Sequence, residues 1–175
     1  MTIEYLKKAN QTEEVVQRDL HDTVENMLFE IEAGGEKTIM HYAKKLDSWE
    51  GEIIVSDESI AAAAATLPEK IKADIRFAHD NIRRFAEAQL GTISECNLEI
   101  VPGLVAGQRQ IPVSAAGCYV PGGRYSHIAS AIMTVTTAKV AGVENIVACS
   151  PPRPVDGIPP SILFALDLCG ADKIL

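Results

Sequence analysis

A chain of 175 residues, 47% of them hydrophobic, is long enough to bury one ordinary core or two small ones. It has no apolar run that could span a membrane, and its first residues lack the apolar stretch of a signal peptide, which together favour the cytoplasm. The net charge of −8 is concentrated in the first 100 residues, where 20 acidic and 11 basic side chains argue against nucleic acid and anionic membranes as partners.

Two helices are predicted at the start of the chain. Residues 12–33 carry apolar side chains at helical spacing, with acidic residues in the first turn. Gly34 and Gly35 end this pattern, and a shorter helix over 36–46 follows. Two helices joined by a glycine pair indicate a helical hairpin.

A strand and two further helices are expected between residues 51 and 91. Residues 51–55 form a short apolar run typical of a strand. Ser56 begins a capping sequence that leads into the alanine run 61–65. Pro68 suits the first turn of a long helix, and Gly91 ends it.

The segment from residue 98 to Pro112 is extended by pattern and interrupted by turn residues. Gln108 and Arg109 lie here between turns. A solvated linker and a ligand-facing loop explain them equally well, because loops held by a scaffold often carry function.

A strand, a glycine turn and a helix are predicted over residues 115–140. The small apolar run 115–120 suits a buried strand, the turn Pro121, Gly122 and Gly123 ends it, and Ser126 is the expected N-cap of the helix. Such a turn can cradle a phosphate, because glycines let the backbone approach an anion and the helix start offers free N–H groups. Neither GxGxxG nor GxxxxGK[ST] is present, so a plain strand-to-helix connection remains an alternative.

A second unit of the same kind closes the sequence. Residues 145–150 read as a buried strand, 161–169 as a helix and 172–175 as the beginning of another strand. Alternating strands and helices indicate an α/β fold with a parallel sheet. We therefore expect a mainly helical N-terminal region, residues 1–100, and the first part of a truncated Rossmann-like domain, residues 101–175. The chain is expected to be an N-terminal fragment.

Cysteines and histidines give no metal-binding pattern. The four cysteines lie 22, 31 and 20 residues apart, without a CxxC pair, and are expected to be buried thiols. The four histidines show no HxxxH or HExxH spacing.

Several segments together resemble the histidinol dehydrogenase family. They are GCYVPGG (117–123), AKVAGV (138–143), IVACSPP (146–152) and, earlier, EAGGEKTIMHYAKKLD (32–47), DNIRRFAEAQ (80–89) and VPGLVAGQRQIPVSAAG (101–117). The resemblance implies an enzyme that uses NAD and zinc, works by two successive hydride transfers and forms homodimers. It makes Tyr119, Pro121, Gly122 and Gly123 the expected cofactor-binding residues, although a core aromatic is the alternative for Tyr119.

The same resemblance places the zinc ligands and the Glu–His acid–base pair beyond residue 175. We therefore expect no catalytic residue and no metal ligand in this chain, which alone should be inactive. A nucleotide-binding module without chemistry is the alternative on fold grounds.

The substrate expectation rests on a departure from the usual family pattern. After the glycine pair the family typically has Ala-Tyr-Pro-Ser-Ser, whereas this chain has Arg124 and His127, both of which suit an acidic head group. The pattern is similar to the sulfopropanediol dehydrogenase branch, which oxidises the alcohol 2,3-dihydroxypropane-1-sulfonate to sulfolactate. The alternatives are that Arg124 contacts the NAD pyrophosphate and that the substrate is histidinol.

Overall fold

A computed structural model describes residues 14–122, 125–154 and 156–175, and it divides the chain into two compact units, Met1–Leu46 and Asp47–Leu175. The domain boundary expected near residue 100 stays a prediction, and that residue lies within the second unit. Among the described residues, no helix combines the length and apolar character needed to cross a membrane.

The first unit consists of the helical hairpin. Helix α1 (Glu14–Gly34) and helix α2 (Glu36–Asp47) confirm the two predicted helices. Gly35 joins them with a φ of +59°, a conformation that glycine adopts without steric cost. The Tyr42 hydroxyl donates a hydrogen bond of 2.6 Å to Glu30 Oε2, which links the two helices.

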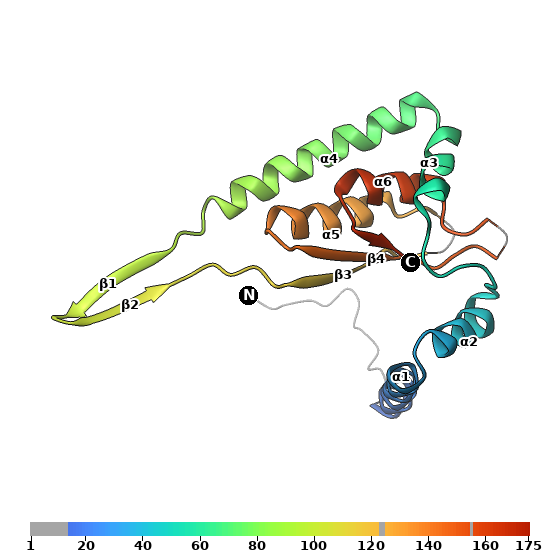
Figure 1. Ribbon diagram of the computed structural model, residues 1–175, viewed down its shortest axis with the longest axis horizontal. Coiled ribbons are helices and arrows are strands. Elements are labelled where there is room, and N and C mark those ends of the chain that lie inside the picture. The colour runs from blue at the N-terminus through green and yellow to red at the C-terminus, as the bar shows by residue number, and fades with distance from the viewer. Residues whose placement is uncertain (1–13, 123–124, 155) are drawn as a thin grey trace, which may run out of the picture. The chain divides into compact units, whose positions relative to one another are not determined.

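A parallel sheet organises the second unit (Figure 1). Its strands are β3 (Ala115–Tyr119), β4 (Asn145–Cys149) and β5 (Lys173–Ile174), adjacent in that order. The register pairs Ala115 with Asn145 and Tyr119 with Cys149. The mixed α/β class with a small parallel sheet is thereby confirmed.

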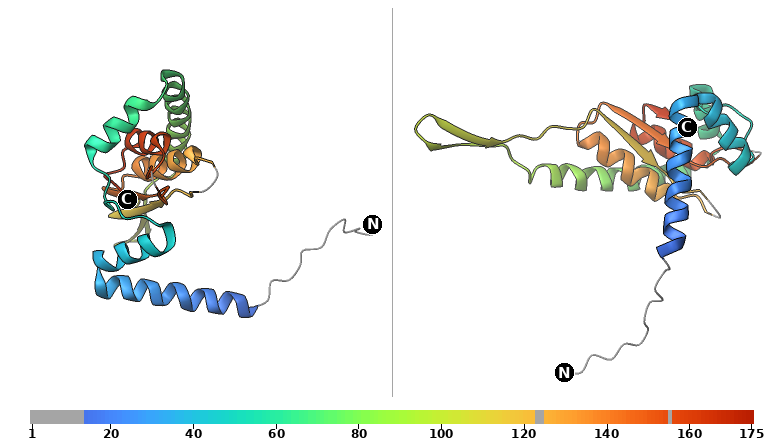
Figure 2. Two further views of the ribbon diagram at one scale, coloured as in Figure 1. Left: turned by 90° about the vertical axis from the view of Figure 1, so that its right-hand side faces the viewer. Right: turned by 90° about the horizontal axis from the view of Figure 1, so that it is seen from below.

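Helices cover one face of this sheet. Helix α5 (Ile128–Val140) connects β3 to β4, and helix α6 (Pro160–Cys169) connects β4 to β5. Both connections step across the sheet in the same direction, and connections of the same hand then place their helices on the same side. Figure 1 and the left view of Figure 2 show both helices on that side. Helix α4 (Glu69–Leu90) packs against α5 and α6, and α3 (Asp57–Thr66) packs against α6.

The two faces of the sheet differ in burial. Cys118, Val120 and Ile146 point into the core beneath the helices and are almost completely buried. Tyr119, one position away along β3, is 60% exposed, because successive side chains of a strand point to opposite faces. The second face of the sheet is therefore open in this unit.

A long hairpin precedes the sheet in sequence. Strands β1 (Cys96–Val101) and β2 (Leu104–Gln108) pair antiparallel, with Leu98 opposite Ala106, and all their residues are exposed. The extended pattern predicted here is confirmed. Cys118 and Cys169 are buried and Cys149 is half-buried, but Cys96 is exposed on β1, so the expectation that all four cysteines are buried is wrong for Cys96.

Two local predictions are also wrong. Residues 51–55 form no strand; only Val55 joins the sheet edge, where its N–H donates to the Ile174 carbonyl over 2.9 Å. The N-cap of α5 is His127 and not Ser126, because the helix begins one residue later than its serine suggests. The other predicted helices are present, with α4 ending at Leu90 before Gly91.

Candidate functional site

A small pocket lies at the carboxyl ends of β3 and β4. Its lining comes from the turn after β3 (Pro121, Gly122, Tyr125 and Ser126) and from the turn after β4 (Ser150 to Arg153). Pro159, the N-cap of α6, and Ile162 within α6 complete it. Parallel strands end at the same edge of a sheet, which is where α/β proteins bind ligands.

Backbone contacts hold the two turns together. The Val120 N–H donates to the Cys149 carbonyl over 2.8 Å, which continues the β3–β4 ladder to the edge of the pocket. A Cβ atom on Gly122 would lie 3.1 Å from the Pro151 ring. Such a distance is tighter than ordinary van der Waals contact, so glycine permits this close approach of the two turns.

The predicted site residues do not all meet at this pocket. Pro121 and Gly122 line it. Tyr119 lies on the open face of the sheet, and His127 is exposed at the N-cap of α5 without a side-chain capping bond. Gly123 and Arg124 fall outside the described residues. Cofactor binding by these residues therefore stays a prediction.

Ser150 and Arg153 are lining residues that the sequence reasoning missed. Ser150 is 5% exposed, and its Oγ has no hydrogen-bond partner among the described atoms. Arg153 is exposed, and its backbone pairs with Gly157 in both directions, at 2.9 and 3.0 Å. The sequence signal that could have identified them is a hydroxyl side chain directly after a buried strand, Ser150, followed three residues later by a cation, Arg153.

The electrostatics of the pocket favour an anion. None of the described lining residues is an aspartate or glutamate. The N-cap residues of α5 and α6, His127 and Pro159, provide no side-chain capping bond. Pro160 has no N–H and the Ile162 N–H donates to the Pro159 carbonyl over 2.9 Å, so α6 can offer the Ser161 N–H to an anion. Helix α5 can offer the N–H groups of Ile128 and Ala129. Burial raises the pKa of the nearby Cys118 and Cys149 thiols, which keeps them neutral near pH 7.

Comparison with known proteins assigns the family. A sequence profile described as histidinol dehydrogenase matches residues 10–175. The chain belongs to the histidinol dehydrogenase family.

Relatives within this histidinol dehydrogenase family match the whole chain. It is 62% identical over 175 residues to the sulfopropanediol 3-dehydrogenase of Ruegeria pomeroyi. This alignment includes 100% of the present chain and 40% of that protein. It is 52% identical to a histidinol dehydrogenase homolog of the same organism, again covering 40% of it. The chain therefore spans about two fifths of the length of these relatives.

A solved histidinol dehydrogenase has the same fold. The enzyme from Elizabethkingia anophelis superposes with a TM-score of 0.82 at 27% sequence identity. The alignment covers 97% of this chain and 37% of that one. The α/β arrangement described above is thus the arrangement of the family.

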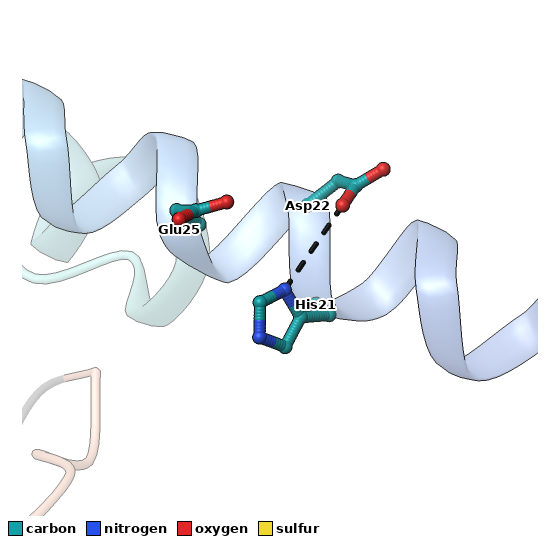
Figure 3. A group of neighbouring side chains, drawn as sticks. All are labelled: His21, Asp22 and Glu25. Atoms are coloured by element: carbon teal, nitrogen blue, oxygen red, sulfur yellow. Dashed lines mark ion pairs between the residues drawn. The ribbon is translucent and has the colours of Figure 1, made fainter.

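The described residues of this histidinol dehydrogenase family member do not fit a catalytic zinc site. Within them, one group could place its ligand atoms around an ion: His21, Asp22 and Glu25 on α1 (Figure 3). All three are exposed, and His21 Nδ1 lies 4.0 Å from Asp22 Oδ1. A catalytic zinc needs fixed ligands in a shaped cavity, so this group is a solvated face of the helix.

Gln108 and Arg109 do not line the pocket. Gln108 is the last residue of β2, and its Nε2 donates to the Ser94 carbonyl over 3.4 Å. Both side chains are exposed. The structure thus gives Gln108 a contact within the base of the hairpin.

Proposed function

We propose that this protein is a NAD- and zinc-dependent alcohol dehydrogenase that oxidises 2,3-dihydroxypropane-1-sulfonate through the aldehyde to sulfolactate. The observation that carries the proposal is the 62% identity, over all 175 residues, to a protein named sulfopropanediol 3-dehydrogenase. The family membership supports the dehydrogenase class.

Two features of the small pocket support a role in holding a phosphate group of a dinucleotide cofactor. The pocket lies beside a glycine turn and the first residues of two helices, and none of its described lining residues is a carboxylate. Both features favour an anionic phosphate. Pro121 and Gly122 would hold the cofactor there, with Gly123 and Tyr119 added by the family resemblance. Bound NAD would supply the hydride acceptor, and this chain supplies the backbone surface that orients it.

Zinc binding is proposed for the part of the relatives that this chain does not cover. The exposed group on α1 does not fit a catalytic ion, and no step of the reaction is assigned to it. The Glu–His acid–base pair is placed in the same uncovered part. Catalytic chemistry is therefore assigned to none of the described residues.

Arg124 and His127 are the proposed sulfonate-binding residues. His127 is exposed at the start of α5, where the helix dipole also favours an anion. Arg124 belongs to the same turn in sequence. A guanidinium pairs well with a sulfonate, whereas it would repel the ammonium group of histidinol.

The test uses the complete gene product that contains this chain. We expect a higher kcat/KM for 2,3-dihydroxypropane-1-sulfonate than for histidinol with NAD. Arg124→Ala should cost about 2 to 4 kcal/mol in kcat/KM for the sulfonate, with little change in the KM for NAD. The control is Arg84→Ala, which removes an exposed arginine of α4.

Two outcomes would count against this substrate. If the protein prefers histidinol, the proposed substrate is wrong and the activity is the one named for the solved relative. A defect of Arg124→Ala confined to NAD would instead make Arg124 a cofactor residue. Neither outcome would remove the dehydrogenase proposal itself.

We also propose a homodimer, as the family resemblance implies. Helix α1 leaves a row of apolar side chains exposed in its own unit, Leu20, Val24 and Leu28. Such a row is typical of a surface that another copy covers.

A further inference from the structure

The pocket contains a buried hydroxyl, that of Ser150, which makes no hydrogen bond within the described structure. Ser150 is the residue after β4, and its backbone N–H donates to the Leu175 carbonyl over 3.0 Å, which fixes the residue at the end of the sheet. Its side chain is 5% exposed and its Oγ finds no partner in the described structure. An unpaired buried hydroxyl destabilises a fold, and because this one lies in the wall of a pocket, it is available to a partner that arrives from outside.

Positive electrostatic features surround this hydroxyl. The pocket that Ser150 lines is also lined by Ser126, just before the N-cap of α5, and by Pro159, the N-cap of α6. Both helices thus begin beside it, and both are longer than two turns, so their dipoles add at the same place. Arg153 brings a full positive charge to the same lining.

Arg153 is available for a ligand. No ion pair of its side chain is present among the described residues, and Asp156, the acidic residue closest to it in sequence, does not line the pocket. Its backbone pairing with Gly157 fixes the start of the turn, so the guanidinium is carried by a defined piece of backbone. An arginine beside a buried hydroxyl and helix-start N–H groups is a suitable combination for a phosphate oxygen.

We propose that Ser150 and Arg153 bind a phosphate group of the nicotinamide dinucleotide, with the Ser150 hydroxyl donating to a phosphate oxygen and Arg153 neutralising its charge. This inference rests on the proposed function and extends it to two residues in the turn after β4. The site faces the glycine turn, so the dinucleotide is held between the ends of two neighbouring strands.

A sulfonate shares the tetrahedral oxyanion chemistry of a phosphate. Binding experiments therefore use ADP-ribose, which carries the diphosphate without nicotinamide, beside 2,3-dihydroxypropane-1-sulfonate and phosphate-free adenosine. Calorimetric titration of the complete gene product gives the Kd of ADP-ribose and of NAD. Steady-state kinetics give the KM for NAD and for the sulfonate.

Two variants test the residues, and a third provides a matched control. Ser150→Ala and Arg153→Gln should each weaken ADP-ribose and NAD binding about tenfold, while adenosine binding and the sulfonate KM stay the same. Arg153→Gln should also reduce the salt dependence of NAD binding. Thr136→Val removes another buried hydroxyl, 1% exposed in α5 and outside the pocket lining, and should leave both affinities unchanged.

Folding is monitored separately from binding. Because the hydroxyl is unpaired without ligand, Ser150→Ala should not lower Tm, but it should reduce the rise of Tm that NAD produces in the wild type. Arg153 is exposed, so Arg153→Gln provides a second variant without a folding defect.

The inference is overturned if both variants bind ADP-ribose as tightly as the wild type, or if only the sulfonate KM changes. Failure of the proposed function has a different signature. A wild-type protein that binds ADP-ribose but reduces no NAD with either alcohol would contradict the dehydrogenase, while the three variants would still decide the phosphate site.

Discussion

Asp172 shows how one side chain can connect two strands. Its Oδ2 accepts the Ile146 N–H over 2.7 Å, and its own N–H donates to the Ile146 carbonyl over 2.8 Å. Ile146 is fully buried, so its N–H depends on this carboxylate for an acceptor. The residue thus links the beginning of β5 to β4 through both its side chain and its backbone.

Asp172→Ala should therefore lower the free energy of unfolding by about 2 kcal/mol, because a buried N–H loses its acceptor. Urea unfolding of the complete gene product measures the change. Asp172→Asn keeps an acceptor oxygen and should lose less. Lys139→Ala removes only the 3.7 Å ion pair to Asp172 and should cost under about 1 kcal/mol; an equal loss in both alanine variants would contradict the hydrogen-bond explanation.

The cysteines should differ in their reactivity. Burial raises the pKa of Cys118, Cys149 and Cys169, which lowers the thiolate fraction of each at a given pH, whereas Cys96 is exposed on β1. Iodoacetamide at pH 8 should label Cys96 first, and the buried thiols should react faster as the pH rises toward their raised pKa values. Peptide mass spectrometry follows each site.

Cys96→Ser is the control for the labelling experiment, and it should abolish the fast phase. Labelling of Cys118 or Cys169 at the rate of Cys96 would contradict the burial of these thiols. The four cysteines could not be separated from the sequence, because cysteine is apolar enough to be expected inside. The exposure of Cys96 depends on what packs against its hairpin.

At the scale of the elements, two glycines end helices in different ways. Gly170 follows α6 with a φ of +87°, whereas Gly91 follows α4 with a φ of −64°. Only the first conformation is unfavourable for a residue with a Cβ atom. A Cβ on Gly170 would also lie 3.3 Å from Lys139 Cε, the flexible part of a side chain.

Gly170→Ala should consequently destabilise the protein by about 1 to 2 kcal/mol through backbone strain. Gly91→Ala is the matched control and should be neutral or slightly stabilising, because its backbone already suits alanine. Thermal unfolding of both variants makes the comparison. Equal Tm values for the two would show that the left-handed conformation at residue 170 costs nothing.

Most elements could be predicted from the sequence because their signals are local. Apolar spacing located α4 and α5, and small apolar runs located β3 and β4. Residues 51–55 misled the prediction, since a short apolar run does not reveal whether a partner strand exists. The missing partner of the Ser150 hydroxyl could not be predicted either, because the fold alone decides which residues surround it, among them Pro121 and Ile162 of the same pocket.

At the scale of the whole molecule, the exposed apolar row of α1 makes the proposed homodimer testable. Leu28, 62% exposed, lies in that row, so Leu28→Glu should weaken association by placing a charge in an apolar contact. Light scattering of the complete gene product at several concentrations measures the mass. Asp22→Asn, exposed on the opposite side of α1, is the control and should leave the mass unchanged.

A monomeric wild-type protein with full activity would rule the homodimer out. If the dimer is unaffected by Leu28→Glu, the interface does not include this row of α1. The sequence alone suggested the apolar row but could not show its exposure, which depends on whether α2 covers it.

The shared direction of the two strand-to-helix connections has a consequence for heat resistance. The same step across the sheet that builds the core also brings the beginnings of α5 and α6 to one edge, beside Ser150. A phosphate bound there, as proposed above, would contact parts of both connections and would therefore bind the folded form alone. By mass action, each tenfold increase of a saturating cofactor adds about 1.4 kcal/mol to the free energy of unfolding, so the cofactor supply would help determine how long the fold survives heating.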